Sequence, residues 1–435
     1  MNPCHRNAIT DARLKSDRLK KEGSRPAGLL ATAVTTFHGA LMSGFLCALL
    51  VAATQPAQAQ TESVVYDFLF GTGARPNSTL LMAGDNLYGT TRGGGRWERG
   101  VIFSVNTTTD SETVLHSFNG PAYANPNGLI WGFGKYVFIG TTPGFGFRPY
   151  GTVYAMGHGA KRGHPFRGLY SFNKSQGANG TTPVSPMAID SAGNIYGVTT
   201  FGGSHGGGEI FEITRPGTAT ILYGFAGGTA DGANPYFGLV LDPQGNLYGT
   251  TSHGGSGTGC SFGCGVVYKF APDGTETVLY NFTGGADGAD PHASLALDGA
   301  GNLYGTTYQG GGAGCNGSGC GTVFKVTPGG TETVLYSFAG GLDGAEPLAG
   351  VILDAQGNLY GTTYSGGGSG CGGDGCGTVF KVTPGGSETI LYSFTGGADG
   401  GLPMAGLVMD GQGNLFGTAS TGGFEGFGVV FEVTP

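Results

Sequence analysis

Four aspartates at matching positions are the residues whose type and spacing best fit ligand binding. Each lies in a loop that begins with Gly-Gly, and each precedes another glycine: Asp231, Asp287, Asp343 and Asp399. Carboxylates gathered at one site could bind Ca²⁺, which takes several oxygen ligands, or the hydroxyl groups of a sugar. Asp before Gly is also a common turn residue whose carboxylate bonds the nearby backbone. The turn is the simpler interpretation, so we expect no cofactor and keep Ca²⁺ as the alternative.

Six cysteines form three close pairs in successive repeats of the chain. The pairs are Cys260 with Cys264, Cys315 with Cys320, and Cys371 with Cys376. In an exported protein such pairs predict local disulfides. A zinc site would need four Cys or His ligands, and His253 is the only histidine near any pair in the sequence. We therefore predict three disulfides, each within one loop.

The first two repeats depart from the others and carry side chains that often anchor a recognition surface. Arg96, Trp97 and Arg99 lie in a glycine-rich loop of the first repeat. In the second repeat, residues 158–167 form a basic cluster, and residues 145–148 add aromatic and basic side chains. We favour the Trp97 loop as a binding surface. Decay of the repeat without any function is the alternative.

Catalytic motifs give little support for an enzyme. No His-Glu-x-x-His or Walker-type sequence occurs, and the histidines do not recur in register. Residues from different repeats could still meet in a catalytic site. The second hypothesis is therefore a hydrolase or lyase acting on carbohydrate, with two carboxyl groups as acid and base.

Seven repeats of one unit occupy most of the chain. The clearest marker is Gly-Asn-Leu-Tyr-Gly-Thr-Thr, whose asparagines, Asn246, Asn302 and Asn358, are each 56 residues from the next. Variants of the marker give the remaining copies, at Asn86, Asn194, Asn414 and residues 139–142.

Each repeat contains four short runs of strand-forming residues. In one repeat these runs are residues 349–353, 358–363, 378–382 and 389–394. Hairpin turns of the forms Asp-x-x-Gly-Asn and Pro-Gly-Gly join them. The turn aspartates are Asp242, Asp298, Asp354 and Asp410. Four antiparallel strands repeated seven times predict an all-β fold, a seven-bladed β-propeller formed by residues 60–435.

The ends of the repeat region discriminate between a closed ring and a linear β-solenoid. Residues 62–68 match the fourth strand of a repeat, and residues 429–433 match a third strand that lacks its fourth. Pairing of the two completes a blade and removes exposed sheet edges, which a solenoid would not require. We therefore predict a ring closed by its N- and C-terminal strands.

The long loops are expected at one end of the blades. Connections between second and third strands, and between consecutive repeats, emerge at the same end of an antiparallel blade. That end carries the cysteines, the four loop aspartates and Trp97, whereas the opposite end has short turns and the basic residues 161–167. Since function on a rigid scaffold usually lies in its longer loops, the end with Trp97 is the predicted binding face.

Composition indicates a folded, exported protein. Glycine accounts for 91 of 435 residues without a collagen-like period, and 39% of residues are hydrophobic, which is enough for a core. Residues 1–59 contain a basic stretch, an apolar stretch from Ala40 to Ala53, and Ala57-Gln58-Ala59. This order predicts a cleaved signal peptide. Lipid attachment at Cys47 is the alternative.

The charge of the remaining chain excludes some partners. The signal peptide holds seven Lys or Arg and three Asp or Glu, which leaves 14 basic and 26 acidic side chains and a net charge of −12. Such a surface opposes binding of nucleic acid. No second apolar stretch of membrane-spanning length follows, and the chain ends at Pro435 without an anchor. We expect a secreted or periplasmic monomer that neither binds nucleic acid nor inserts into a membrane.

The repeat unit resembles a known family. Gly-Thr-Val-Phe-Lys-Val-Thr-Pro-Gly-Gly-Thr-Glu-Thr-Val-Leu-Tyr-Ser-Phe, followed by a Gly-Gly-x-Asp-Gly-Ala-x-Pro loop and Gly-Asn-Leu-Tyr-Gly-Thr-Thr, is similar to the GloVer tandem repeat of secreted bacterial proteins. Members are often called choice-of-anchor proteins, because a sorting or anchoring segment follows the repeats, which this chain lacks. The strand order also resembles NHL-type propeller repeats. Neither resemblance implies a catalytic residue.

Together these features predict a secreted, non-enzymatic propeller. We expect it to bind a protein or glycan at the cell surface or in the periplasm. The predicted binding residues are Arg96, Trp97, Arg99 and the four loop aspartates.

Overall fold

A computed structural model describes residues 60–120, 124–132, 137–144, 150–157, 165–172, 180–215 and 217–435. The predicted signal peptide, residues 145–148, and residues 158–164 of the basic cluster lie outside the described residues. Within the described part, the regular structure is β-strand apart from two short 3-10 helices, Cys315–Gly317 and Cys371–Gly373.

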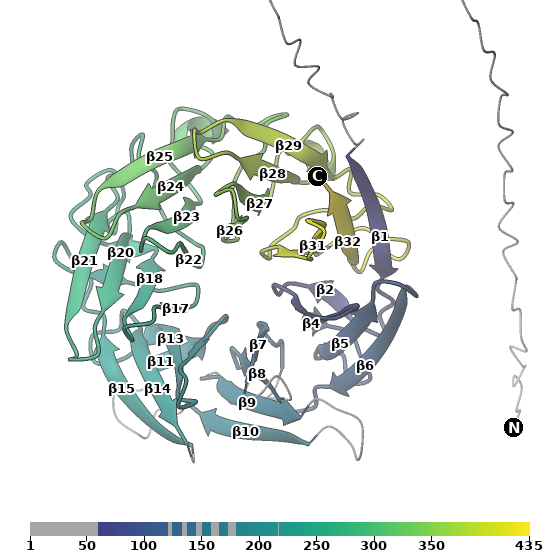
Figure 1. Ribbon diagram of the computed structural model, residues 1–435, viewed down its shortest axis with the longest axis horizontal. Helices are drawn as coiled ribbons and strands as arrows, with labels where there is room; N and C mark the ends of the chain where they lie inside the picture. Colours follow the sequence, from purple (N-terminus) through teal and green to yellow (C-terminus); the bar gives the residue numbers. More distant parts are fainter. Residues whose placement is uncertain are drawn as a thin grey trace, which may run out of the picture. The chain divides into compact units, whose positions relative to one another are not determined.

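Each blade is an antiparallel sheet whose strands follow chain order from the inside outward. In one blade, β26 (Ile352–Leu353) is innermost, followed by β27 (Leu359–Thr363), β28 (Thr378–Val382) and β29 (Glu388–Ser393). The four predicted runs are therefore strands, although the innermost is shorter than expected. Seven such blades surround a common axis, which confirms the predicted propeller (Figure 1).

The other blades repeat this arrangement. The first blade contains β2 (Ala74–Pro76), β3 (Leu81–Ala83), β4 (Asn86–Gly93), β5 (Val101–Asn106) and β6 (Ser111–Ser117), and the second contains β7 (Leu129–Trp131), β8 (Val137–Thr142), β9 (Thr152–Gly157) and β10 (Phe166–Ser171). The third contains β11 (Gly180–Pro183), β12 (Ala188–Ile189), β13 (Ile195–Gly202), β14 (Glu209–Thr214) and β15 (Thr218–Gly224). The fourth contains β17 (Val240–Leu241), β18 (Leu247–Thr251), β20 (Val266–Phe270) and β21 (Glu276–Asn281), and the fifth contains β22 (Ala296–Leu297), β23 (Leu303–Thr307), β24 (Thr322–Val326) and β25 (Glu332–Ser337). The short strands β16 (Gly232–Ala233) and β19 (His253–Gly254) pair with each other.

The last blade is completed by the first strand of the chain. It consists of β30 (Val408–Met409), β31 (Leu415–Ala419), β32 (Val429–Thr434) and, on the outside, β1 (Thr61–Asp67). In this pairing Val64 lies opposite Phe431. The predicted closure by N- and C-terminal strands is thus confirmed.

A buried aromatic ring at the centre of each third strand forms the core. The tip of the ring lies against the glycine of the neighbouring second strand, so that a Cβ atom at Gly361 would be only 2.6 Å from the ring of Phe380. The same close contact occurs in all seven blades. The seven rings are Phe103, Tyr154, Phe211, Tyr268, Phe324, Phe380 and Phe431, each with 0% exposure.

These rings also join each blade to the next. The phenylalanine that follows the outer strand of one blade meets the core ring of the following blade edge to face; Phe338 and Phe380, for example, have ring centroids 5.1 Å apart. Edge-to-face pairs are a favourable aromatic geometry. The other six boundaries have the same pair, at 4.9–5.3 Å: Phe68 with Phe103, Phe118 with Tyr154, Phe172 with Phe211, Phe225 with Tyr268, Phe282 with Phe324, and Phe394 with Phe431.

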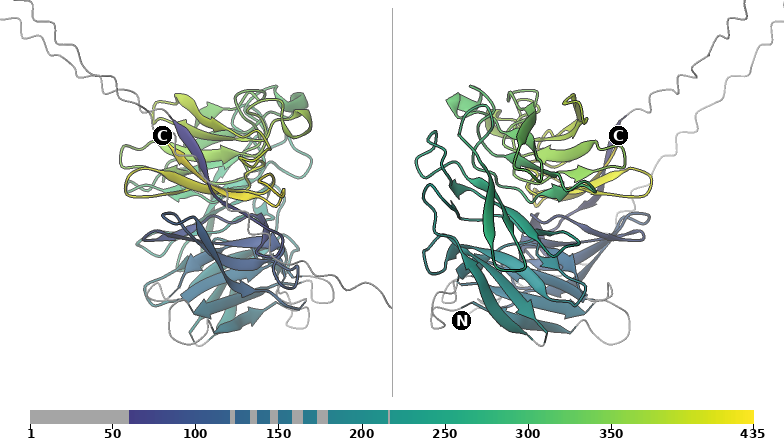
Figure 2. Two further views of the ribbon diagram at one scale, coloured as in Figure 1. Left: turned by 90° about the vertical axis from the view of Figure 1, so that its right-hand side faces the viewer. Right: turned by 60° about the vertical axis from the view of Figure 1, so that its left-hand side comes forward.

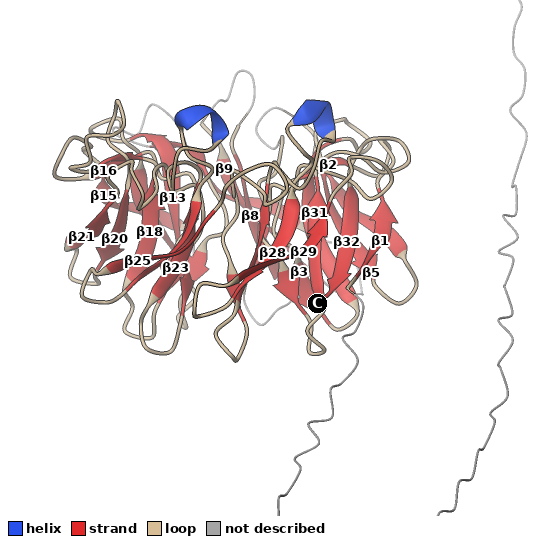
Figure 3. Cartoon of the chain, turned by 90° about the horizontal axis from the view of Figure 1, so that it is seen from above, coloured by secondary structure: helices blue, strands red, loops and turns tan. Residues whose placement is uncertain are grey.

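The connections between second and third strands and those between blades emerge at one end, which we call the loop face. Side views show strands of neighbouring blades side by side, with loops beyond both ends (Figure 2). The two 3-10 helices lie at the same end as β2 and β16 (Figure 3). The predicted separation of long loops from short turns is therefore present in the fold.

Three disulfides tie the loops of successive blades on the loop face. They join Cys260 to Cys264, Cys315 to Cys320 and Cys371 to Cys376, with Cα atoms 5.2, 5.3 and 5.2 Å apart. Each packs on a glycine of the following Gly-Gly loop. At Gly396, which has φ +77°, a Cβ atom would be 2.7 Å from both sulfurs of its disulfide. The disulfides therefore hold two loops together and confirm the predicted pairs.

Deletion of β1 tests the closure. Compared with a chain that begins at Gln60, a chain that begins at Gly71 should lose solubility or show a large drop in melting temperature, because the backbone groups of β32 lose their partners. An unchanged melting temperature would show that the ring does not depend on β1.

Replacement of one disulfide tests its energetic role. Changing Cys315 and Cys320 together to Ser should lower the free energy of unfolding by no more than about 3 kcal/mol, the value for a 15-residue loop, because this loop is shorter. Peptide mapping of the unreduced wild-type protein should recover three bridges within loops. Stoichiometric zinc in the purified protein would contradict this assignment.

Candidate functional site

A corner built around one proline precedes the inner strand of every blade. The residue before the proline has a left-handed backbone, with φ between 53° and 60°. Asn and Asp adopt this conformation readily, whereas Thr and Leu need support from their surroundings. The seven residues are Arg75, Asn125, Thr182, Asn234, Asp290, Glu346 and Leu402.

Backbone hydrogen bonds to two blades hold each corner in place. The N–H of Asp290 donates to the carbonyl of Cys264 at 2.9 Å, in the blade that the chain is leaving. The carbonyl of Asp290 accepts from the N–H of Tyr308 at 3.0 Å, in the blade that the chain is entering. Leu402 makes the corresponding bonds to Cys376 and Ser420, at 2.8 and 3.4 Å. These bonds compensate for the unfavourable backbone and fix the corner relative to both blades.

The residue after the proline lines the mouth of the central channel in all seven blades. These seven half-buried or buried residues are Asn77, Asn127, Val184, Tyr236, His292, Leu348 and Met404. Together with Arg92, Pro143, Thr182, Ser185, Thr200 and Phe237 they surround a space of about 420 Å³, which we call the mouth pocket. Ligand pockets commonly have volumes of about 300–1,000 Å³. The fold therefore brings one side chain from every blade to a pocket of ligand size.

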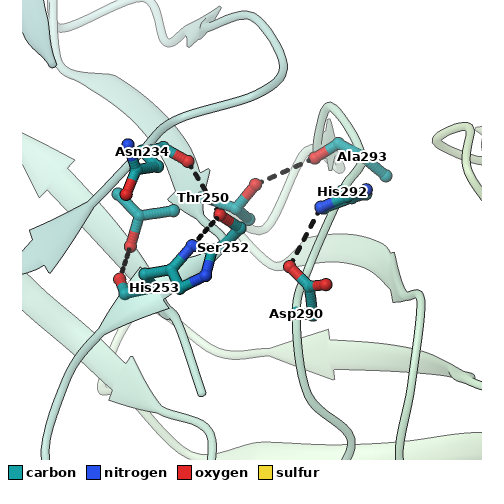
Figure 4. Close-up of polar contacts among 8 residues, drawn as sticks. Asn234, Thr250, Ser252, His253, Asp290, His292 and Ala293 are labelled. Atoms are coloured by element: carbon teal, nitrogen blue, oxygen red, sulfur yellow. Dashed lines mark hydrogen bonds and ion pairs between the residues drawn. The ribbon is translucent and has the colours of Figure 1, made fainter. Parts of the chain in front are cut away.

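His292 is fixed in the wall of the mouth pocket by neighbours on two blades. Its Nε2 atom is 2.9 Å from Oδ1 of Asp290. Its ring packs against Tyr236, at 4.8 Å between centroids, and stacks on Tyr308 at 5.5 Å. Figure 4 shows Asp290 and His292 pointing toward one another beside Ser252 and His253. These contacts fix the orientation of the imidazole ring in the pocket wall.

The neighbouring Ser252 serves the framework. It is buried, and its hydroxyl donates to the carbonyl of the corner residue Asn234 at 3.1 Å and lies 2.6 Å from Nδ1 of His253 (Figure 4). A hydroxyl held in this way supports a corner.

The four loop aspartates do not line the mouth pocket. Each accepts hydrogen bonds within its own loop and from a tyrosine of the outer strand. Asp287, for example, accepts from the hydroxyl of Tyr280 at 2.9 Å and from the N–H of Thr283 at 2.7 Å. Asp231, Asp343 and Asp399 bond to Tyr223, Tyr336 and Tyr392 in the same way. The carboxylates are thus used as loop caps, and the fold does not bring them together.

A glutamate of the next blade faces each of these aspartates. Burial, followed by the charge of Asp287, raises the pKa of Glu332 to about 7. The Oε1 atom of this glutamate is buried and has no hydrogen-bond partner among the described residues. The other boundaries with this pair, where the glutamate pKa is also about 7, are Glu276 with Asp231, Glu388 with Asp343, and Glu62 with Asp399.

The aspartates of the hairpin turns act as predicted. Oδ1 of Asp354 accepts from the backbone N–H groups of Gln356 and Asn358, and Oδ2 accepts from the side chain of Asn358 and from Tyr360. Burial raises the pKa of Asp354, but these hydrogen bonds together lower it below its usual value.

Trp97 lies on the loop face outside the mouth pocket. Half of its surface is exposed, and the guanidinium of Arg96 lies 5.0 Å from its ring centroid. The carbonyl of Arg99 accepts from the N–H of the corner residue Asn125 at 3.0 Å. The loop therefore adjoins a corner but contributes no residue to the pocket lining.

The seven residues that follow the corner prolines were missed by the sequence analysis. A usable signal was present: a proline recurs at this place in all seven repeats, in five of them as Ala-x-Pro, whereas the residue after it changes from Asn to Val, Tyr, His, Leu and Met. When one position of a repeat varies while the residues around it stay constant, that position indicates a surface that is not needed for the fold itself.

Among the described residues, no three His, Cys, Asp or Glu side chains are grouped as metal ligands would be. In the same part of the chain, none of the helices is sufficiently long and apolar to span a membrane.

The glutamates predict how stability depends on pH. Their pKa is higher in the folded protein than the usual 4.5, so the folded protein holds protons that the unfolded chain releases. The free energy of unfolding should therefore fall as the pH rises from about 4.5 through about 7. His116, whose pKa is lowered by burial, acts in the opposite sense, but at one site only.

Melting temperatures at pH 5 and pH 8 test this dependence. The wild-type protein should melt at the higher temperature at pH 5, and the variant with Glu276→Gln, Glu332→Gln and Glu388→Gln should show a clearly smaller difference. Glu425→Gln, at an exposed position, is the control and should behave like the wild type. An equal difference in the triple variant would contradict the assignment.

Comparisons with solved structures show the fold. The extracellular domain of a protein from B. thetaiotaomicron aligns with a TM-score of 0.50 at 10% identity, covering 84% of this chain and 39% of that one. Two structures of puromycin hydrolase align with TM-scores of 0.51 and 0.50 at 14% and 15% identity, covering 80% and 82% of this chain. This chain spans about half the length of those hydrolase chains. At these identities the likeness concerns the propeller alone.

Comparison with curated protein sequences returned no match. The Gloeobacter/Verrucomicrobia repeat matches residues 26–262 and 256–435, which together span most of the chain and include every blade described above. The seven blades, the repeated aromatic core and this match agree, and the chain belongs to the Gloeobacter/Verrucomicrobia repeat family.

Proposed function

We propose that this protein is a non-enzymatic binding module of the cell surface or periplasm that holds a protein or glycan at the mouth pocket. The observation that carries the proposal is the contrast between the constant backbone of the corners and the varied side chains that line the mouth pocket. The corners have one backbone conformation in all blades, whereas the residues after the prolines differ in size and polarity. A constant scaffold with a varied lining is what recognition of one asymmetric ligand requires.

The disulfides support an extracytoplasmic location. Three bridges within loops are typical of proteins that fold in an oxidising compartment. A propeller of similar fold is an extracellular domain in the B. thetaiotaomicron protein, which is compatible with this location.

The lining of the mouth pocket favours binding over carbohydrate hydrolysis. Most glycoside hydrolases use two carboxyl groups on either side of the scissile bond. None of the described residues that surround the mouth pocket is Asp or Glu. Asp290, a corner residue beside the pocket, is paired with His292.

One short sequence has the letters of a nucleophile elbow but not its setting. Gly202, Ser204 and Gly206 fit the pattern Gly-x-Ser-x-Gly, which in hydrolases lies between a strand and a helix. Here the segment joins the strands β13 and β14, and Ser204 bonds His205 at 3.0 Å in an exposed loop. The segment therefore lacks the strand-to-helix turn that presents the serine in those enzymes.

Trp97 and Arg99 remain the proposed outer part of the binding surface. Their loop adjoins the corner at Asn125, so a ligand larger than the mouth pocket would reach them across the loop face.

A glycan array and capture from cell-surface extracts, each with a matched set of variants, test the proposal. Tyr236→Ala should weaken binding of the captured ligand at least tenfold, and the Trp97→Ala/Arg99→Ala double variant should weaken it less. The two substitutions of the double variant are at the surface and should leave the fold intact. Gln356→Ala, in an exposed turn at the opposite end, is the control. Unchanged binding by Tyr236→Ala, with loss in the double variant, would move the site to the Trp97 loop.

A further inference from the structure

The mouth pocket has two chemically different sides. Corner residues follow one another around the ring in chain order, so Asn77 and Asn127 are neighbours, and Arg92 belongs to the same blade as Asn77. Val184 and Tyr236 continue the wall in one direction, and Leu348 and Met404 approach Asn77 from the other. The asparagines and Arg92 therefore form a polar arc, and most of the other corner side chains are apolar or aromatic. His292 interrupts them between Tyr236 and Leu348, and three hydroxyl groups lie in the same blade as Val184: those of Thr182, Ser185 and Thr200.

Arg92 gives the polar arc a positive charge. It is exposed, it is the only Lys or Arg among the described residues of the lining, and in the described part of the chain it has no carboxylate partner. No Asp or Glu of the described residues lines the pocket with it. In a protein with a net charge of −8, an unpaired arginine in a pocket without carboxylates favours a ligand with a carboxylate of its own.

The asparagines supply hydrogen-bonding groups beside this charge. Oδ1 of Asn77 is buried and has no hydrogen-bond partner among the described residues. A buried amide oxygen gains free energy when a donor reaches it. A sugar hydroxyl is a donor of suitable size, and the amide of Asn127 lies in the next blade.

Phe237 lies where the mouth pocket meets a narrower space of the channel. It follows Tyr236, at a position where the other six blades have Ser78, Gly128, Ser185, Ala293, Ala349 and Ala405. It lines both the mouth pocket and the narrow space of about 50 Å³ farther along the channel. A large ring in place of a small side chain takes up more of the passage between the two spaces, and we infer that it acts as the floor on which a ligand entering from the loop face stops.

Resting on the proposed function, we propose that the mouth pocket recognises a uronic acid residue at the end of a glycan chain. The carboxylate pairs with Arg92, hydroxyl groups bond to Asn77 and Asn127, and the apolar face of the ring packs on Tyr236 and Phe237. The floor made by Phe237 accepts a chain end and excludes a threaded chain.

Titration calorimetry with two probes tests the assignment. The probes are a disaccharide with a non-reducing terminal glucuronic acid and the matched disaccharide with terminal glucose. The wild-type protein should bind the acidic probe at least tenfold more tightly. Arg92→Gln should remove that preference while retaining weak binding of both probes, and Lys269→Gln, which changes a cation of β20 outside the pocket lining, should keep it.

Phe237→Ala tests the floor separately. With the floor removed, an oligosaccharide whose only uronic acid is internal should gain affinity relative to the terminal probe, whereas the wild-type protein should reject it.

The results distinguish failure of this inference from failure of the proposed function. Equal binding of both disaccharides, unaffected by Arg92→Gln but lost in Tyr236→Ala, would overturn the acidic ligand and leave the binding site in place. Binding of neither disaccharide, together with capture of another ligand that Tyr236→Ala abolishes, would overturn the uronic acid assignment alone. Absence of any binding that depends on Tyr236 would overturn both.

Discussion

The ring depends on one contact that recurs at every blade boundary: an aromatic ring on the third strand of one blade that meets, edge to face, the phenylalanine after the fourth strand of the preceding blade. Because the tip of the core ring lies against a glycine, the second strand can approach without a side chain in between. A Cβ atom there would displace the ring and, with it, the contact to the neighbouring blade. The core ring and the glycine beside it therefore determine both the packing within a blade and the contact of that blade with the preceding one.

The corners hold different side chains at equivalent positions of this regular ring. Their left-handed residues are bonded to two blades at once, so the position of the side chain after each proline is set by the ring as a whole. Changing Tyr236 or His292 alters the lining while the backbone that carries it is fixed elsewhere. The same division explains why the disulfides, the loop aspartates and the glutamates all lie away from the mouth pocket: they hold loops and boundaries.

Most of the fold could be predicted from the sequence because its signals are local and repeated. The Gly-Asn turns, the Cys315–Cys320 spacing and the match of residues 62–68 to a fourth strand each depend on a few neighbouring residues. The inner strand was predicted too long, since Ala349 and Gly350 line the narrow space in the channel; the carbonyl of Ala349 accepts from Thr306 of the preceding blade instead of from a strand partner.

The site could not be predicted in the same way. A positive φ at Leu402 has no local signature, because bonds from two distant segments impose it, and only the ring brings Asn77 and Met404 together. The loop aspartates were considered as ligands because their recurrence was visible, whereas the hydrogen bonds that they accept from tyrosines seven or eight residues earlier, on the outer strand, were not.

Because β1 and β32 close the ring, the architecture does not depend on the blade at which the chain begins. Thr61 lies opposite Thr434, so the two ends of the ring meet where the other blades have an ordinary hairpin turn between their third and fourth strands. A short glycine linker across that gap, with the chain opened at the turn between β28 and β29 instead, would give a circular permutant with the same pairings and the same mouth pocket. Connectivity and architecture are separable in this ring, and insertion of the propeller into another protein could begin at any of several blades.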